Sequence, residues 1–132
     1  MNTKDLGNLG ENLACEYLVN NGYNILGRNY RINFGEIDII AQKKQNFLGK
    51  NDKTIHFVEV KALGGQTSQC FYPEEHVNYK KQNKLKRLAE IWLSKNKVKE
   101  NTPYQIDIIA VSFDHKTNEP KLNYFENIAS DA

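Results

Sequence analysis

The chain reads GEIDII at residues 35–40 and HFVEVK at residues 56–61, and these two stretches decide the fold. Each places an acidic residue inside a run of branched and aromatic residues that favours a β-strand. Side chains alternate along a strand, so Phe57, Glu59 and Lys61 share one face and the valines between them share the other. Bulky apolar residues on both faces indicate a strand covered on both sides. Burying an acid and a lysine in such a strand costs free energy unless these groups bind a ligand or partner.

The rest of the chain predicts how these strands are covered. Apolar residues recur at spacings of three and four over residues 4–21 and 77–93, which predicts two amphipathic helices. Thr3 is the predicted N-cap of the first helix and Gly22 its C-terminal stop. Strands are predicted at residues 23–30, 36–42, 54–63, 104–113 and 121–126, with longer loops at residues 43–53 and 64–76. The order αβββαββ predicts an α/β fold with a mixed central sheet flanked by helices.

Composition narrows the class of protein. A chain of 132 residues with 39% hydrophobic and 26% charged residues is typical of one soluble domain, which we place at residues 1–128 with a short tail at residues 129–132. Cys15 and Cys70 fit no metal-binding spacing and are too few for a disulfide framework, so we expect a reducing compartment and a cytoplasmic protein. No apolar run approaches the roughly 18 to 20 residues of a membrane span, and no signal peptide is recognisable.

Positive charge is concentrated in the second predicted helix. Residues 78–99 contain eight basic residues and one acidic residue, a net charge of +7, within a chain whose net charge is +2. This asymmetry favours a polyanionic partner such as nucleic acid. The alternative is that the lysines only solvate the outer face of a surface helix. The predicted nucleic-acid contacts lie at the start of the helix and are Lys80, Lys81, Gln82 and Lys84.

Four residues predict a site for phosphodiester hydrolysis. If the strands at residues 36–42 and 54–63 are neighbours, about 4.8 Å apart, Asp38 and Glu59 converge on one divalent cation. Two hard carboxylates, with water and phosphate filling the other positions, suit Mg²⁺ or Mn²⁺. Lys61, about 6.6 Å further along the same face as Glu59, would orient the attacking water or neutralise charge on the phosphate. Glu11, at the edge of the first helix's apolar stripe, would add a direct or indirect contact to the metal.

Each of these residues has a simpler interpretation when it is taken alone. Glu59 and Lys61 would form an exposed ion pair on a strand. Asp38 would be an acid at a strand edge or turn, and Glu11 a residue on a helix surface. The prediction of a hydrolytic site therefore rests on the four residues occurring together.

Two other residues stand outside that combination. His56 lies on the face opposite Glu59 and has no second histidine at ligand spacing, so we expect it to pack or to face solvent. Asp107 repeats the pattern of an acid in an apolar run at residues 105–111. Its role stays open between a functional one and structural hydrogen bonding near the second helix.

Taken in order, the motifs resemble the bacterial YraN-like family, also called UPF0102, over residues 6–111. The residues that carry the resemblance are Gly7-x-x-Gly10-Glu11, Gly35-Glu36-Ile37-Asp38, Phe57-Val58-Glu59-Val60-Lys61, Lys81-Gln82, and Asp107 with Ala110-Val111. The family is similar to PD-(D/E)xK, restriction-endonuclease-like proteins and, in motif order, to archaeal Holliday junction resolvases. Leu63 stands where members commonly have a basic residue, and Gln105 where they commonly have an arginine.

The resemblance implies a restriction-endonuclease-like fold and a nuclease site formed by Glu11, Asp38, Glu59 and Lys61, with Lys81 or Gln82 as an accessory. Residues and resemblance together predict a nucleic-acid-binding protein that is a magnesium- or manganese-dependent endonuclease acting on DNA, including branched DNA. The alternatives are a catalytically inactive nucleic-acid-binding module and a protein-interaction domain of the same fold. A homodimer would suit a two-stranded substrate, although no residue requires one.

Overall fold

The computed structural model describes residues 2–45, 52–64, 76–114 and 116–129. Along the chain these form α1 (Thr3–Asn20), β1 (Tyr23–Ile32), β2 (Gly35–Lys43), β3 (Ile55–Leu63), α3 (Tyr79–Lys95), β4 (Tyr104–Phe113) and β5 (Pro120–Phe125). The predicted order αβββαββ is confirmed for these elements. The predicted loop at residues 64–76 lies mostly outside the described residues, as does the middle of the loop at residues 43–53.

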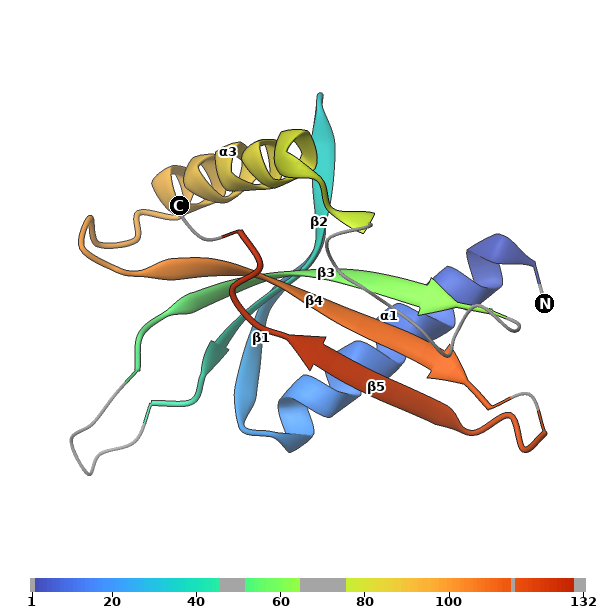
Figure 1. Ribbon diagram of the computed structural model, residues 1–132. Helices are drawn as coiled ribbons and strands as arrows, with labels where there is room; N and C mark the ends of the chain where they lie inside the picture. Colours follow the sequence, from blue (N-terminus) through green and yellow to red (C-terminus); the bar gives the residue numbers. More distant parts are fainter. Residues whose placement is uncertain (1, 46–51, 65–75, 115, 130–132) are drawn as a thin grey trace.

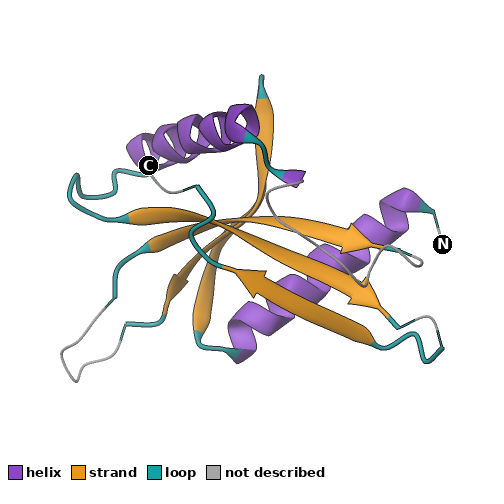
Figure 2. Cartoon of the chain, viewed as in Figure 1, coloured by secondary structure: helices purple, strands orange, loops and turns teal. Residues whose placement is uncertain are grey.

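The five strands form one mixed sheet in the order β1-β2-β3-β4-β5. The pairs β1–β2, β2–β3 and β4–β5 are antiparallel, while β3 and β4 are parallel. A parallel pair needs a crossover connection, and α3 lies between β3 and β4 along the chain. The sheet is a twisted layer with α1 on one face and α3 on the other (Figures 1 and 2). This is the predicted α/β architecture, with the arrangement of a restriction-endonuclease-like fold.

The two faces of the sheet pack two separate cores, which explains why β3 is apolar on both sides. Phe57 packs in the cluster under α3, where its ring meets Trp92 edge to face with centroids 5.7 Å apart. Val58 packs in the cluster under α1 together with Leu18 and Ile109. Branched residues on both faces of the central strands therefore fill both cores, as the alternation in the sequence predicts.

The helix ends differ from the prediction by one or two residues. Asn2, not Thr3, caps α1, because its extended backbone lets its side-chain oxygen accept the Asp5 N–H at 2.8 Å. The predicted cap at Thr3 is therefore wrong. Gly22 follows α1 with a positive φ of 87°, a conformation that favours glycine and ends the helix as expected. Asn78 caps α3 in the same way as Asn2 caps α1, so this helix begins at Tyr79 rather than at residue 77.

The first residues of β2 pair with β1 but not with β3. Its ladder with β3 covers only residues 39–42, although its pairing with β1 continues to Gly35. The tip of the β1–β2 hairpin instead approaches the first turns of α3 (Figure 1). A Cβ atom at Gly35 would come within 2.9 Å of Lys84 Cε and 3.1 Å of Leu88 Cδ1, so the hairpin tip lies against these two side chains. A fork between β2 and β3 therefore opens next to Asp38.

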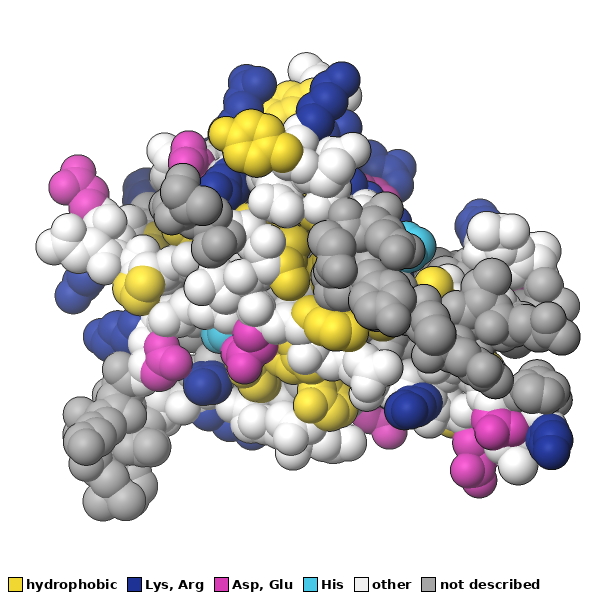
Figure 3. All heavy atoms as spheres, in the orientation of Figure 1, with side chains coloured by type: hydrophobic (Ala, Val, Ile, Leu, Met, Phe, Trp, Pro, Cys, Tyr) yellow, Lys and Arg dark blue, Asp and Glu magenta, His cyan; other side chains and the backbone are white. Residues whose placement is uncertain are grey.

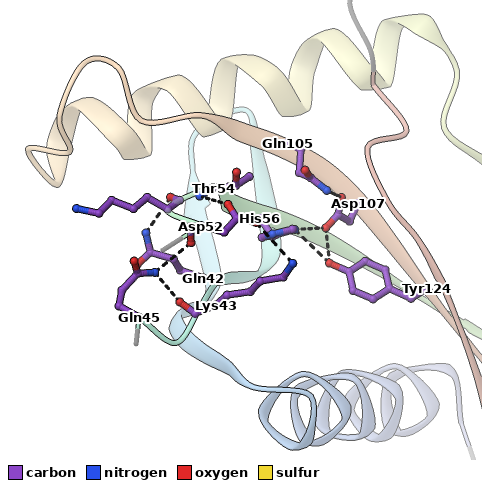
Figure 4. Close-up of polar contacts among 10 residues, drawn as sticks. Gln42, Lys43, Gln45, Asp52, Thr54, His56, Gln105, Asp107 and Tyr124 are labelled. Atoms are coloured by element: carbon purple, nitrogen blue, oxygen red, sulfur yellow. Dashed lines mark hydrogen bonds and ion pairs between the residues drawn. The ribbon is translucent and has the colours of Figure 1, made fainter. Parts of the chain in front are cut away.

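Asp107 is the centre of a buried hydrogen-bond network (Figure 4). Its carboxylate accepts hydrogen bonds from His56 Nδ1 at 2.6 Å, Gln105 Nε2 at 2.8 Å, the Asn127 N–H at 2.8 Å and the Tyr124 hydroxyl. Burial by itself would raise the pKa of Asp107, but these hydrogen bonds outweigh it and hold the pKa below its usual value. The network joins β3, β4 and β5 and the segment after β5.

The face on which Asp107 lies corrects one expectation. By strand alternation Asp107 shares a face with Ile109 and Val111, which pack in the α1 cluster, and not with Ile106 and Ile108, which pack under α3. The structure thus favours hydrogen bonding as its role, but the expected location near the second helix is wrong. His56 was expected either to pack or to face solvent, and in the structure it is buried.

Replacing Asp107 by alanine is expected to lower the free energy of unfolding at pH 7 by about 3 kcal/mol or more, because several buried donors lose their acceptor. Since the folded state lowers the pKa of Asp107, the carboxylate stabilises the protein above the unfolded-state value near 3.8, and this contribution disappears as the pH falls below it. Urea unfolding from pH 3 to pH 7 measures both effects. The matched control is Glu100→Ala at an exposed turn. Equal losses in the two variants would contradict a structural role for Asp107.

Candidate active site

The carboxylate of Asp38 lies in the fork between β2 and β3. The Val60 N–H donates to Asp38 Oδ2 at 2.8 Å, and Val60 stands between Glu59 and Lys61 on β3. The condition set for the predicted site, that the two strands are neighbours, is met: they form an antiparallel ladder with Ile39 opposite Val58. Asp38 is the next residue beyond this ladder, so its side chain replaces the missing backbone partner of β3. The carboxylate from β2 is therefore held against the backbone of the Glu59–Lys61 segment.

The pKa of Asp38 is raised to about 7. Burial is the largest cause, and the hydrogen bond from the Val60 N–H opposes it. The nearby carboxylates of Glu11, Glu59 and Glu36 raise the pKa further, in that order. Acids from three different elements therefore influence one another at this fork. At neutral pH Asp38 is partly protonated.

Glu11 approaches the fork from α1. The preceding residue, Gly10, lets the helix lie close to β3, because a Cβ atom there would come within 2.9 Å of the Ala62 side chain. Burial raises the pKa of Glu11, although the guanidinium of Arg28 opposes the shift and Glu36 adds to it. The Oε1 atom of Glu11 is buried without a hydrogen-bond partner. This orphaned oxygen costs free energy unless a cation or donor meets it.

Glu59 lies under the first turns of α3. Its Oε1 atom forms an ion pair with Lys81 Nζ at 2.9 Å, and its Oε2 atom is buried without a hydrogen-bond partner. Burial lowers the pKa of Lys61, with Glu59 opposing and the neighbouring Lys81 ammonium adding to the shift. Burial is the largest influence on Lys81 and acts to lower its pKa, but the hydrogen bond and the charge of Glu59, together with smaller contributions from Lys61 and Asp38, outweigh it and raise the pKa. Lys81 is therefore the more firmly charged lysine, and Lys61 the one that more readily loses its proton.

The donor set fits a hard divalent cation. Glu11 and Glu59 each have a buried carboxylate oxygen without a partner, and Asp38 lies close enough to both to feel their charge. Carboxylate oxygens are the ligands that Mg²⁺ and Mn²⁺ prefer. Glu11, Asp38 and Glu59 do not bring three oxygens within 4.8 Å of one another, so two of them with water, rather than a closed cage, would hold the ion.

A different group of potential metal ligands does lie this close together within the described part of the chain. His56, Asp107 and Glu126 bring ligand atoms within 4.8 Å of one another. Both carboxylate oxygens of Asp107 already accept hydrogen bonds, however, including one from His56 itself. The carboxylate of Asp107 is therefore already used within the sheet, although His56 Nε2 is buried without a partner. The fork, where two carboxylate oxygens have no partner, is the candidate site.

The residues predicted to contact nucleic acid have different environments. Lys81 belongs to the acidic site through Glu59. The Gln82 side chain donates to the Val77 carbonyl at 3.1 Å and so stabilises the start of α3. Lys80 and Lys84 are exposed and line a pocket of about 810 Å³ between α3 and the tip of the β1–β2 hairpin. Lysine and arginine side chains gather over α3 at the top of the view in Figure 3.

The sequence prediction missed two features of this surface. Phe34 and Arg87 line the same pocket, and the Arg87 guanidinium lies 5.0 Å from the centroid of the Phe34 ring. The two residues are far apart in the sequence, and no local pattern indicates that they meet. The one available signal is the aromatic residue at a predicted turn, where small polar residues are usual.

Comparison with known proteins identifies the family of the chain. Residues 10–111 match the model of a family described as "Uncharacterised protein family UPF0102". The chain belongs to the UPF0102 family. A UPF0102 protein of Caldicellulosiruptor bescii is 39% identical over 96% of this chain and 98% of its own length. One of Thermodesulfovibrio yellowstonii is 43% identical over 93% of this chain and 94% of its own, and one of Clostridioides difficile is 38% identical over 95% and 100%.

The matched region of this UPF0102 protein includes the whole candidate site, from Glu11 through Lys61 to Lys81. The description of the family assigns no reaction. The structure adds one finding on the class of protein: in the part of the chain that it describes, no helix is both long and apolar enough to cross a membrane.

The raised pKa of Asp38 makes stability depend on pH. Because the folded state binds this proton more tightly than the unfolded state, whose value is near 3.8, stability is expected to fall as the pH rises from about 4 to about 7. The slope attributable to one such group is at most about 1.4 kcal/mol per pH unit. Asp38→Asn keeps an acceptor for the Val60 N–H and should flatten this slope.

Urea unfolding in metal-free buffer between pH 4 and pH 8 measures the effect. Asp5→Asn, an exposed acid in the first turn of α1, is the matched control and should leave the slope unchanged. If Asp38→Asn had the same pH dependence of stability as the wild type, the pKa of Asp38 would not be raised in the fork.

Proposed function

We propose that this UPF0102 protein is a cytoplasmic, nucleic-acid-binding endonuclease that hydrolyses phosphodiester bonds of DNA with Mg²⁺ or Mn²⁺. One observation supports this above all others. Buried carboxylate oxygens without partners meet a lysine of lowered pKa at one fork of the sheet, beside a helix of strong positive charge. A structural ion-pair cluster would satisfy its oxygens, whereas a cation site leaves them for the ion.

In the proposed site Asp38 and Glu59 hold the cation, and Glu11 adds a direct or water-mediated contact. When bound, the ion polarises the phosphate and lowers the pKa of a water molecule. The protein's own contribution is to place the ligands. The Val60 N–H orients Asp38, and the close approach of α1 at Gly10 brings Glu11 to the same fork.

Lys61 and Lys81 have different roles in the proposed site. Lys61 has a lowered pKa, so a larger fraction of its side chains is neutral than for an ordinary lysine, and the neutral amine can accept a proton from the attacking water. Lys81 stays charged and neutralises the negative charge that grows on the phosphate oxygens. Lys80 and Lys84, further out on α3, hold the neighbouring phosphates of the strand.

Lys61→Ala is expected to lower the cleavage rate by about 100-fold or more, because one positioned acid–base or electrostatic group typically contributes that much. Its DNA affinity in metal-free buffer should stay close to that of the wild type. Glu59→Gln should lose cleavage and also Mn²⁺ affinity, measured by calorimetry, since an amide is a weaker ligand than a carboxylate. The matched control is Lys121→Ala, an exposed lysine on β5, which should cleave normally.

The assay offers duplex, single-stranded, flap and four-way junction DNA, with Mg²⁺ and Mn²⁺ tested separately. The ion pair between Lys81 and Glu59 favours one specific alternative, a binding module in which Lys81 takes the place of the cation. If the wild-type protein binds these DNAs but cleaves none of them, the binding module is the correct function.

The contribution of α3 to DNA binding can be tested apart from the acidic site. Replacing Lys80 and Lys84 together by glutamate should weaken binding to DNA of any sequence and reduce the slope of log affinity against log salt by about 0.9 for each phosphate that the protein no longer neutralises. Lys81 is left unchanged because it contacts Glu59. The control variant replaces Lys95, the last residue of α3, and Lys99, shortly after the helix, by glutamate, which changes the net charge equally. Equal effects of the two variants would show that net charge, not this surface, determines affinity.

A further inference from the structure

The pocket between α3 and the tip of the β1–β2 hairpin combines two kinds of surface. Phe34, Leu85 and Leu88 supply an apolar wall, and Lys80, Lys84 and Arg87 supply positive charge. The pocket also reaches Glu59 and Lys81 of the candidate active site. An apolar wall, a basic rim and a connection to the acidic site fit a ligand that is flat and apolar at one end and anionic at the other.

The position of Phe34 in this pocket is fixed by its surroundings. The ring is partly buried at the turn between β1 and β2, and the Arg87 guanidinium lies 5.0 Å from its centroid. The adjacent Gly35 lies against Lys84 and Leu88, whose side-chain atoms would be 2.9 Å and 3.1 Å from a Cβ atom at that position. The aromatic side chain is therefore presented by a hairpin that packs tightly against α3.

We propose that this pocket binds the base of an unpaired nucleotide of a DNA strand, stacked on Phe34, with its phosphate on the lysines of α3. The inference rests on the proposed function and specifies its substrate class. Bases inside a duplex are stacked and paired, so an aromatic side chain in a pocket cannot reach their faces. An unpaired nucleotide offers both the flat base and the charged phosphate that the two kinds of surface complement.

The energies favour a DNA that already has an unpaired nucleotide. Stacking of one base on an aromatic side chain contributes about 1–3 kcal/mol. Extruding a paired base costs a few kcal/mol, which is as much or more. The pocket therefore does not open an intact duplex, and it selects single strands, flaps and bulges over fully paired DNA.

The test compares three short duplexes by fluorescence anisotropy in buffer containing EDTA. One duplex is fully paired, one has a single bulged thymine, and one has a bulge of the same length with an abasic nucleotide. The last two share backbone charge and flexibility and differ only in the base. We expect the wild type to bind the bulged thymine about 5- to 100-fold more tightly than the abasic bulge.

Three variants test whether the pocket causes the difference in affinity between the bulged thymine and the abasic bulge. Phe34→Ala should abolish the preference for the bulged thymine, whereas Phe34→Tyr, which keeps the ring, should retain it. Tyr79→Ala removes an aromatic residue of α3 that is 77% exposed and does not line the pocket, and it should also retain the preference. Circular dichroism and thermal unfolding establish that each variant is folded.

The outcomes separate this inference from the proposed function. Tight, salt-dependent binding with equal affinity for the two bulges would overturn the base pocket and leave DNA binding intact. A lack of binding to all three duplexes would overturn both. Binding of poly-glutamate that is abolished in Phe34→Ala would assign the pocket to an acidic peptide instead of a nucleotide.

Discussion

The hydrogen bond from the Val60 N–H to Asp38 stands at the point where β2 separates from β3, and the rest of the site depends on that separation. A regular ladder would pair the two backbones and leave Asp38 as one side chain among others on a flat sheet. The fork instead brings its carboxylate to the backbone between Glu59 and Lys61. The same departure sends the tip of the β1–β2 hairpin towards α3, where the pocket with Phe34 forms. One irregularity of the sheet thus produces both the acidic site and the pocket beside it.

The sequence predicted those features that depend on local periodicity. Alternation along residues 56–61 predicted that Glu59 and Val58 lie on opposite faces of the strand. The two cores of the structure lie on the faces that this alternation requires. The order of the elements followed from apolar spacing alone. Helix caps were less predictable, because Asn2 and Thr3 are both good caps and the extended backbone of Asn2 decided between them.

Contacts between distant residues could not be predicted in the same way. Lys81 was predicted to contact phosphate, but its ion pair with Glu59 depends on how α3 crosses β3, which no spacing within the helix encodes. Phe34 and Arg87 meet because the hairpin leans on α3. His56 and Tyr124 meet Asp107 only after β3, β4 and β5 have aligned in register. Each of these contacts follows from tertiary packing, and the sequence indicates the participants without indicating the pairs.

Asp38 and Asp107 occupy the same kind of sequence, an acid within an apolar strand, yet they differ in how many donors surround them. Asp107 receives hydrogen bonds from three side chains and one backbone N–H, and its pKa is lowered in spite of burial. Asp38 receives one hydrogen bond from the backbone and lies among other acids, and its pKa is raised to about 7. A protein that only needed to bury a carboxylate would supply donors, as it does at Asp107. At Asp38 the missing donors, together with the unpartnered oxygens of Glu11 and Glu59, leave a concentration of negative charge that a divalent cation would neutralise. The number of donors around each acid, rather than its sequence pattern, is therefore what distinguishes the structural carboxylate from the one that is available to a ligand.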